Sequence, residues 1–182
     1  NIWGFDYDMK SSSESVYYQA NILDWFHFTN EKVSIESIVQ FNNELKTIDV
    51  NPNSKNEFLR YLYQNKKYDV IQYLIFAKKC ELINTWTDDN PWERVAVDLD
   101  ARKSKIFATL LKAYAAEKNQ NLKRKYAFQC IRAAFYLNDM KAIQSIFAQQ
   151  FQNGTKDYLY YWSLYFHCFT KNDASKMMDV AN

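Results

Sequence analysis

The chain has 182 residues, of which 48% are apolar and 24% charged, and its net charge is +2. This composition is typical of a globular protein and excludes a disordered one, and the low net charge argues against a strong field toward nucleic acid or a membrane. Only two glycines and two prolines occur, too few for the turns of strand-rich folds or for phosphate-binding loops, so the sequence predicts an all-α fold.

The first quarter of the chain predicts an extended arm followed by two helices. Residues 1–10 carry three aromatic residues with little helical periodicity. Ser11 and Glu14 have the spacing of a capping box, and the apolar residues that follow share one helix face as far as Phe28. Apolar residues also recur at helical spacing over 35–45, which predicts a second, antiparallel helix.

A break that contains proline separates these helices from the next pair. The sequence at 51–53 is Asn-Pro-Asn, and proline interrupts a helix because it lacks an amide hydrogen and restricts the residue before it. Ser54 and Glu57 offer another capping box, which predicts the start of a short helix. After a polar turn at 65–67, the apolar residues of 71–82 predict a longer helix.

The second half of the chain opens with the clearest helix-start signal. Asn90 stands at the cap, Pro91 at the first helical position and Glu93 at the third, which predicts a helix to about Glu117. Further helices are predicted at 122–137, 140–151, 158–169 and from about Asp173. The sequence therefore predicts a single helical domain, 1–182, in which antiparallel helical hairpins form a bundle or a short α-solenoid.

Three junctions between helices have similar sequences. In each, an aromatic helix end meets a polar turn that contains Asn65, Asn138 or Asn172, and an apolar residue follows about five positions later. The step from Asn138 to Asn172 is 34 residues, the length of one tetratricopeptide repeat, and the step from Asn65 to Asn138 is close to twice that. Over its last two thirds the chain thus resembles tetratricopeptide-like α-solenoid repeats. The resemblance implies a concave groove that holds a peptide or a partner helix.

The residues that usually carry catalysis or bind metals are sparse and scattered. His27 and His167 lie in aromatic stretches without metal-ligand spacing, and both are interpreted as satisfied, partly buried histidines. Cys80, Cys130 and Cys168 lie far apart in apolar stretches, which favours reduced core thiols and a cytoplasmic location. We predict no catalytic, cofactor-binding or metal-binding residue and no enzyme. A helical hydrolase or metal-dependent enzyme stays as an alternative, and it requires these histidines to converge with carboxylates in one pocket.

Two clusters of charge flank predicted helix starts. The acidic cluster of 88–100 is favoured by the helix dipole, and it also suits docking onto a basic partner. The basic cluster of 118–125 is unfavourable at its helix start, which indicates either an ordinary solvated turn or a patch for an acidic partner. The residues of these clusters predicted to contact a partner are Asp98, Asp100, Lys123, Arg124 and Lys125.

The most distinctive predicted helix is apolar nearly all round, from Tyr158 to Phe169. If every side of it were core, its tyrosine hydroxyls and indole N–H would all need buried partners. A groove that leaves ring edges in water avoids this requirement, whereas a central buried helix with tyrosines at its rim is the alternative. The predicted contact residues of this helix are Tyr158, Tyr161, Trp162 and Tyr165.

These patterns together predict a non-enzymatic, soluble module that binds another protein or peptide, with no nucleic acid, membrane or cofactor as partner. A bacterial toxin-neutralising immunity protein is the alternative within the binding class, because small all-α inhibitors have a similar size and a similar aromatic, Lys- and Asn-rich composition. The Tyr160-Tyr161-Trp162 segment is of this kind. The oligomeric state stays open.

Overall fold

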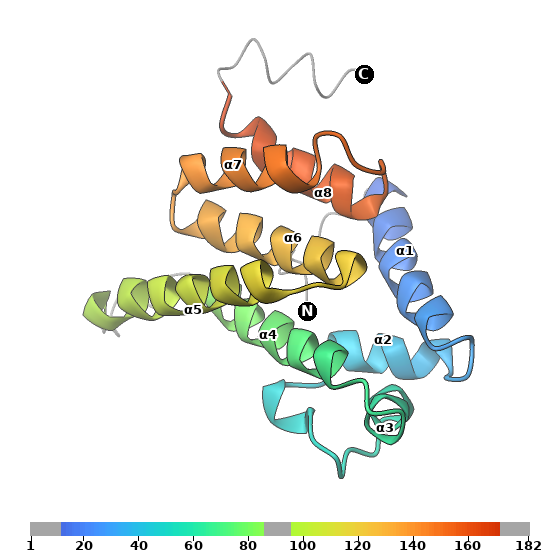
Figure 1. Cartoon of the computed structure of the whole chain (residues 1–182). Helices are drawn as coiled ribbons and strands as arrows, with labels where there is room; N and C mark the ends of the chain where they lie inside the picture. The colour runs from blue at the N-terminus through green and yellow to red at the C-terminus, as the bar shows by residue number, and fades with distance from the viewer. Residues whose placement is uncertain (1–11, 86–95, 172–182) are drawn as a thin grey trace. The chain divides into compact units, whose positions relative to one another are not determined.

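The computed structural model describes residues 12–85 and 96–171, with side chains described over 19–81 and 104–171. These ranges are helical and contain no strand (Figure 1), so the predicted all-α class is confirmed. No helix within them is long and apolar enough to cross a membrane. The predicted arm at 1–10, the cap at Ser11, the helix start at 90–93 and the helix from Asp173 lie outside the described residues.

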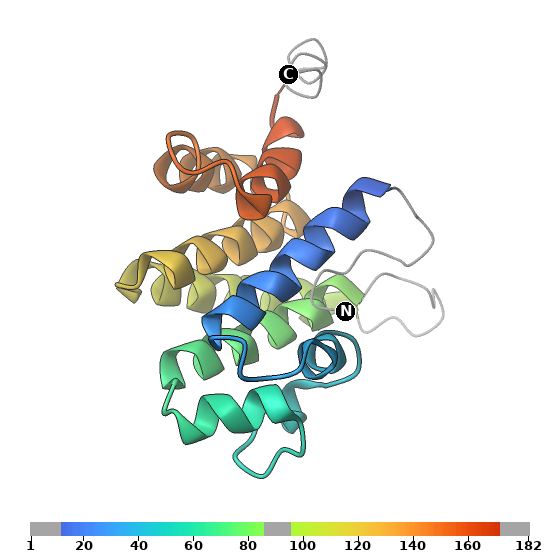
Figure 2. The same cartoon turned by 90° about the vertical axis from the view of Figure 1, so that its right-hand side faces the viewer.

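The chain divides into two compact units, residues 1–85 and 86–182, and each is described by itself. The predicted single domain stays a prediction. In unit 1 each helix packs against the next along the chain, and the short 3-10 helix packs against the last one; its hairpin of α3 and α4 is visible at the lower edge of Figure 2. The elements are α1 (Ser12–Phe28), α2 (Ile35–Asn43), η1 (Thr47–Asp49), α3 (Glu57–Gln64) and α4 (Tyr68–Thr85).

The core of unit 1 is an aromatic cluster to which each of its four α-helices contributes one ring. The Phe58 ring on α3 lies 5.9 Å from Trp25 on α1 and 5.7 Å from Phe41 on α2, between ring centroids. Tyr73 on α4 lies 5.9 Å from Trp25. All four side chains are buried. Large rings at these tilted and edge-on distances bury much apolar area and gain a specific contact, so they fix the packing of the four helices.

The start of α3 differs from the predicted capping box. Its N-cap is Asn56, whose Oδ1 accepts a hydrogen bond from the Leu59 amide at 3.1 Å. Glu57 is therefore the first helical residue, and its carboxylate accepts from the amide and hydroxyl of Ser34 at 3.0 and 2.7 Å. The prediction that Ser54 and Glu57 cap each other is wrong because Glu57 instead binds the N-cap residue of α2. These bonds lower the pKa of Glu57, since they favour its charged form.

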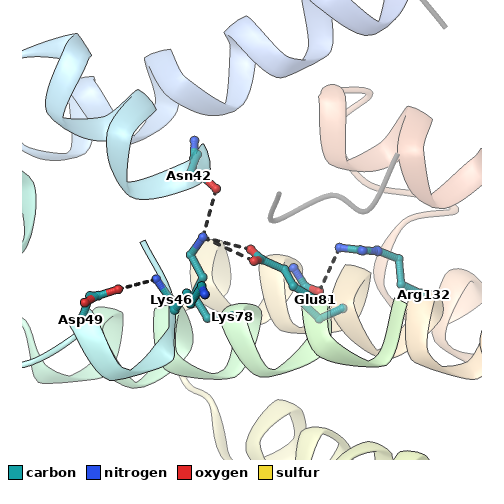
Figure 3. Close-up of polar contacts among 7 residues, drawn as sticks. Asn42, Lys46, Asp49, Lys78, Glu81 and Arg132 are labelled. Carbon is teal, nitrogen blue, oxygen red and sulfur yellow. Dashed lines mark hydrogen bonds and ion pairs between the residues drawn. The ribbon is translucent and has the colours of Figure 1, made fainter. Parts of the chain in front are cut away.

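A buried cation joins α2 to α4 (Figure 3). Lys78 Nζ donates to the backbone oxygen of Asn42 at 3.0 Å, pairs with the carboxylate of Glu81 at 3.2 Å, and lies 5.0 Å from the centre of the Phe41 ring. Burial lowers the pKa of Lys78, and the neighbouring Glu81 opposes this shift only in part. Because Asn42 lies in the last turn of α2, the ammonium group satisfies a carbonyl that the helix leaves open.

Unit 2 consists of four helices packed as two successive hairpins. The helices are α5 (Ala96–Ala116), α6 (Gln120–Tyr136), α7 (Met140–Gln150) and α8 (Tyr158–Cys168). The last three match the predicted ranges within two residues at each end. Helix α6 packs against α5, α7 and α8, and α7 packs against α8 (Figure 1). This central position explains why α6 is buried on most sides, from Lys125 to Ala134.

The same left-handed turn ends α3 in unit 1 and α6 in unit 2. Lys66 and Asn138 have φ values of 52° and 57°. In each turn the following amide, of Lys67 or Asp139, donates to a carbonyl five residues earlier at 2.9 Å, the hydrogen bond of a Schellman motif. Two of the three predicted junctions thus share a backbone turn, in which Asn138 corresponds to Lys66 and not to Asn65. A hydrogen bond of the same span, from the Glu31 amide to the Phe26 oxygen at 3.0 Å, also ends α1, and the junction at Asn172 lies outside the described residues. The tetratricopeptide resemblance stays a prediction.

Candidate interaction surface

Helix α8 has one face fixed in the core of unit 2 and another that reaches solvent. Leu159, Ser163 and Phe166 are buried. On the other face, Tyr161 and Tyr165 are 41% and 50% exposed. We call the predicted contact residues Tyr158, Tyr161, Trp162 and Tyr165 the aromatic stripe.

The buried face of α8 is held by aromatic contacts to α6 and α7. The Phe166 ring lies 5.1 Å from Phe135 and 6.2 Å from Phe128, both on α6. His167 stacks on Phe147 of α7, with 4.3 Å between ring centroids and 6° between ring planes. These contacts fix the backbone of α8, so a partner does not have to order this helix on binding. The aromatic stripe therefore extends from a helix that is already in place.

The four members of the aromatic stripe differ in their surroundings. Trp162 is half-buried, 5.5 Å from the Phe128 ring. The hydroxyl of Tyr158 accepts a hydrogen bond from Lys125 Nζ at 2.6 Å. Tyr161 and Tyr165 present the largest exposed fractions of the stripe, so they are the members best placed to contact a partner.

The exposed aromatic surface continues beyond the predicted stripe. Phe169, in the turn after α8, is 43% exposed, and its ring lies 5.2 Å from Tyr165. The Phe135 ring, at the end of α6, lies 5.3 Å from the Phe169 ring and 5.6 Å from the Tyr136 ring, between centroids. Tyr136 is also exposed. Phe169 was predicted as the end of the aromatic helix, but none of these three residues was among the predicted contacts. Their signal was present at the aromatic helix ends that define the repeated junctions, but periodicity alone does not say which ends face solvent.

The predicted basic cluster is used largely inside unit 2. Arg124 Nη2 lies 2.6 Å from Asp157 Oδ1 and 3.0 Å from the Thr155 backbone oxygen, and the side chain is only 14% exposed. Lys125 is buried. Lys123 lies over the Tyr114 ring, with Nζ 5.5 Å from its centre. Arg124 therefore fastens the loop before α8 to α6, and Lys125 binds Tyr158 at the start of α8, which is the physical reason for these two cations near this helix start.

The remaining predicted residues add no further group to this surface. Asp98 and Asp100 lie in the first two turns of α5, and their side chains fall outside the described part, so their role stays a prediction. The prediction that His27 is partly buried is wrong, because its side chain is 65% exposed. Its Nδ1 lies 3.3 Å from the Glu31 carboxylate. The three cysteines are buried. Among the described side chains no His, Cys, Asp and Glu group is arranged to hold a metal ion.

The two units differ in charge, which the net charge of the whole chain conceals. Residues 19–81 contain eight lysine and arginine residues and eight aspartate and glutamate residues. Residues 104–171 contain ten lysine and arginine residues but only three carboxylates, those of Glu117, Asp139 and Asp157. Each of these three carboxylates accepts a hydrogen bond from a backbone amide at a helix start, those of Asn119, Ala142 and Tyr160. The acidic side chains of this range thus serve as caps, and the excess of lysine and arginine leaves the described surface over 104–171 basic.

Comparison with known proteins adds no relative from which a function could be carried over. No protein-family model matches the chain, and no curated protein and no solved structure is significantly similar to it.

Proposed function

We propose that this chain is a non-enzymatic helical module that binds another protein or peptide through the aromatic stripe of α8. The observation that carries the proposal is the exposure of Tyr161 and Tyr165, at 41% and 50%, on a helix whose opposite face is fixed in an aromatic core. Tyrosine offers a large contact area with few rotatable bonds and is enriched among the residues that dominate binding energy in interfaces.

A run of neighbouring rings, exposed except for the partly buried Phe135, supports the same function. Tyr165, Phe169, Phe135 and Tyr136 follow one another at ring distances of 5.2 to 5.6 Å across the ends of α8 and α6. Contiguous exposed apolar surface on a folded protein is typical of an interaction site, whereas single exposed rings are not. A partner helix or extended peptide laid along this surface would meet several rings at once.

The test compares the chain with two tyrosine variants in affinity purification followed by mass spectrometry. The double variant Tyr161→Ala/Tyr165→Ala removes the exposed rings of the aromatic stripe. Tyr68→Ala removes a 60% exposed tyrosine of unit 1 and is the matched control. We expect one protein to be retained by the wild type and by Tyr68→Ala and lost by the double variant.

The retained protein is then purified and its Kd measured by calorimetry. Each interface tyrosine is expected to contribute about 1 to 2 kcal/mol, so the double variant should bind at least about tenfold more weakly. Far-UV circular dichroism checks that the helices are intact. Equal affinity of the double variant and the wild type, with both folded, would refute the aromatic stripe as the contact surface.

A further inference from the structure

Lysine side chains lie close to the start of α8 and of the aromatic stripe. Lys156 lies just before α8, with Nζ 5.9 Å from the centre of the Tyr160 ring, and Lys171 follows α8 in the next turn. Lys118 and Lys123 lie at the junction of α5 and α6. This junction adjoins the loop before α8, because Arg124 binds Thr155 and the hydroxyl of Tyr114 lies 3.0 Å from Gln150.

The lysines of this region keep their charge available to solvent. Lys118 and Lys156 are exposed, and Lys123 is partly exposed. The nearby carboxylates Glu117 and Asp157 accept backbone amides, and Asp157 also pairs with Arg124. The five lysine and arginine side chains at 118, 123, 124, 125 and 156 outnumber these two carboxylates, so the field near the loop before α8 is positive and attracts a carboxylate partner.

We infer that the partner of the aromatic stripe is an acidic polypeptide segment, whose apolar side chains meet Tyr161 and Tyr165 while its carboxylates face Lys118, Lys123 and Lys156. The inference rests on the proposed function and names the chemistry of its partner. Charge complementarity of this kind raises the association rate and rejects basic partners, and apolar contacts supply most of the affinity.

Two features favour an acidic polypeptide over a nucleic acid. The two arginines of 104–171, Arg124 and Arg132, are engaged in the fold or buried, so no exposed guanidinium fork is offered to phosphates or base edges over this range. The exposed rings also stand nearly perpendicular to their neighbours, at 88° for Tyr160 and Tyr161 and at 77° for Tyr165 and Phe169. Single-stranded bases instead stack on open ring faces.

The test measures fluorescence anisotropy of three labelled probes with the full chain. The first probe is a peptide of about sixteen residues in which Glu and Leu share one helix face, the second has Gln in place of each Glu, and the third is an oligouridylate of equal charge. The chain is used as wild type, as Lys118→Gln/Lys123→Gln/Lys156→Gln, and as Tyr161→Ala/Tyr165→Ala. The matched charge control is Lys32→Gln/Lys55→Gln/Lys79→Gln, three exposed lysines of unit 1.

We expect the Glu peptide to bind at least about tenfold more tightly than the Gln peptide at about 50 mM NaCl, and to lose most of that advantage at about 300 mM. The unit 2 lysine variant should lose the same advantage, whereas the unit 1 lysine variant should keep it. The tyrosine variant should bind both peptides more weakly.

The contrary results separate the two proposals. Equal binding of the Glu and Gln peptides, sensitive to the tyrosine variant, would overturn the acidic partner and leave the proposed function standing. If the Glu peptide bound the tyrosine variant as tightly as the wild type, the proposed function would be overturned. Tighter binding of the oligouridylate, failure of the Glu peptide to bind, or a concentration-dependent dimer in light scattering that excludes the Glu peptide would each overturn the inference.

Discussion

Each unit places a cation among its helices, and the two cations have different consequences. In unit 1, Lys78 is buried between α2 and α4 with Glu81 beside it, and the described charges of this unit balance. In unit 2, Arg124 fastens the loop before α8 through Asp157, the other carboxylates of 104–171 accept amides at helix starts, and lysines and arginines outnumber carboxylates over this range. One cation thus lies in an interior where the described charges balance, and the other organises a loop at a surface where the described charges are mainly positive.

The largest expected effect comes from Lys78→Met in unit 1. The change leaves the Asn42 carbonyl without its ammonium donor and removes the ion pair with Glu81. Removing one partner of a buried charged contact typically costs about 3 kcal/mol, so the free energy of unfolding should fall by about that amount in urea titrations followed by circular dichroism. Lys79→Met, at the exposed neighbouring position, should change it by less than about 0.5 kcal/mol. Equal losses for the two variants would contradict the structural role of Lys78.

The pH dependence of the same variant tests the lowered pKa of Lys78. Burial moves the pKa of this group below its ordinary value of 10.5 in the folded chain. Between the two values the unfolded state binds more protons than the folded state, so this group's contribution to stability rises as pH increases. The stability gap between the wild type and Lys78→Met should therefore widen as the pH approaches 10.5. A gap that narrows over this range would show that the ion pair with Glu81 outweighs burial.

A smaller effect is expected from Arg124→Ala in unit 2. The variant loses the ion pair to Asp157 and the hydrogen bond to Thr155, and Asp157 is also the N-cap of α8. We expect the free energy of unfolding to fall by about 2 kcal/mol. Lys123→Ala, one residue away, loses only a contact with the Tyr114 ring and should cost about 0.5 kcal/mol. Similar small losses for both variants would show that the basic cluster is a solvated turn.

The helices were predictable from sequence because the periodicity of apolar residues and the scarcity of glycine and proline both point to the same class. The cap of α3 was not, because Ser54, Asn56 and Glu57 all belong to residue types found at helix starts, and only the contact of Glu57 with Ser34 of α2 distinguishes them. A cap pattern in the sequence shows which residues could cap the helix, and here the contact of Glu57 with a residue distant in sequence decides among them.

The candidate surface was predictable in composition but not in orientation. A helix that is apolar nearly all round has no polar side, so its residue pattern does not indicate which side is buried. The exposure of Tyr161 and the burial of Phe166 therefore follow only from contacts with α6 and α7. Burial of Lys125 follows likewise from its contact with Tyr158. The segregation of charge between the units, by contrast, is visible in the sequence once the two halves are counted separately.

The smallest predicted effects distinguish the two left-handed turns at the ends of α3 and α6. A lysine side chain is strained at positive φ, whereas asparagine tolerates it, so Lys66→Gly should stabilise the chain by about 1 kcal/mol and Asn138→Gly by about 0.3 kcal/mol. Asn65→Gly should instead destabilise by about 0.5 kcal/mol, because Asn65 has a φ of −92° and donates to the Tyr61 carbonyl. Urea titrations measure all three variants. If Asn65→Gly stabilised the chain more than Lys66→Gly, the left-handed residue of the turn after α3 would be Asn65, and the correspondence of the two turns would shift by one residue.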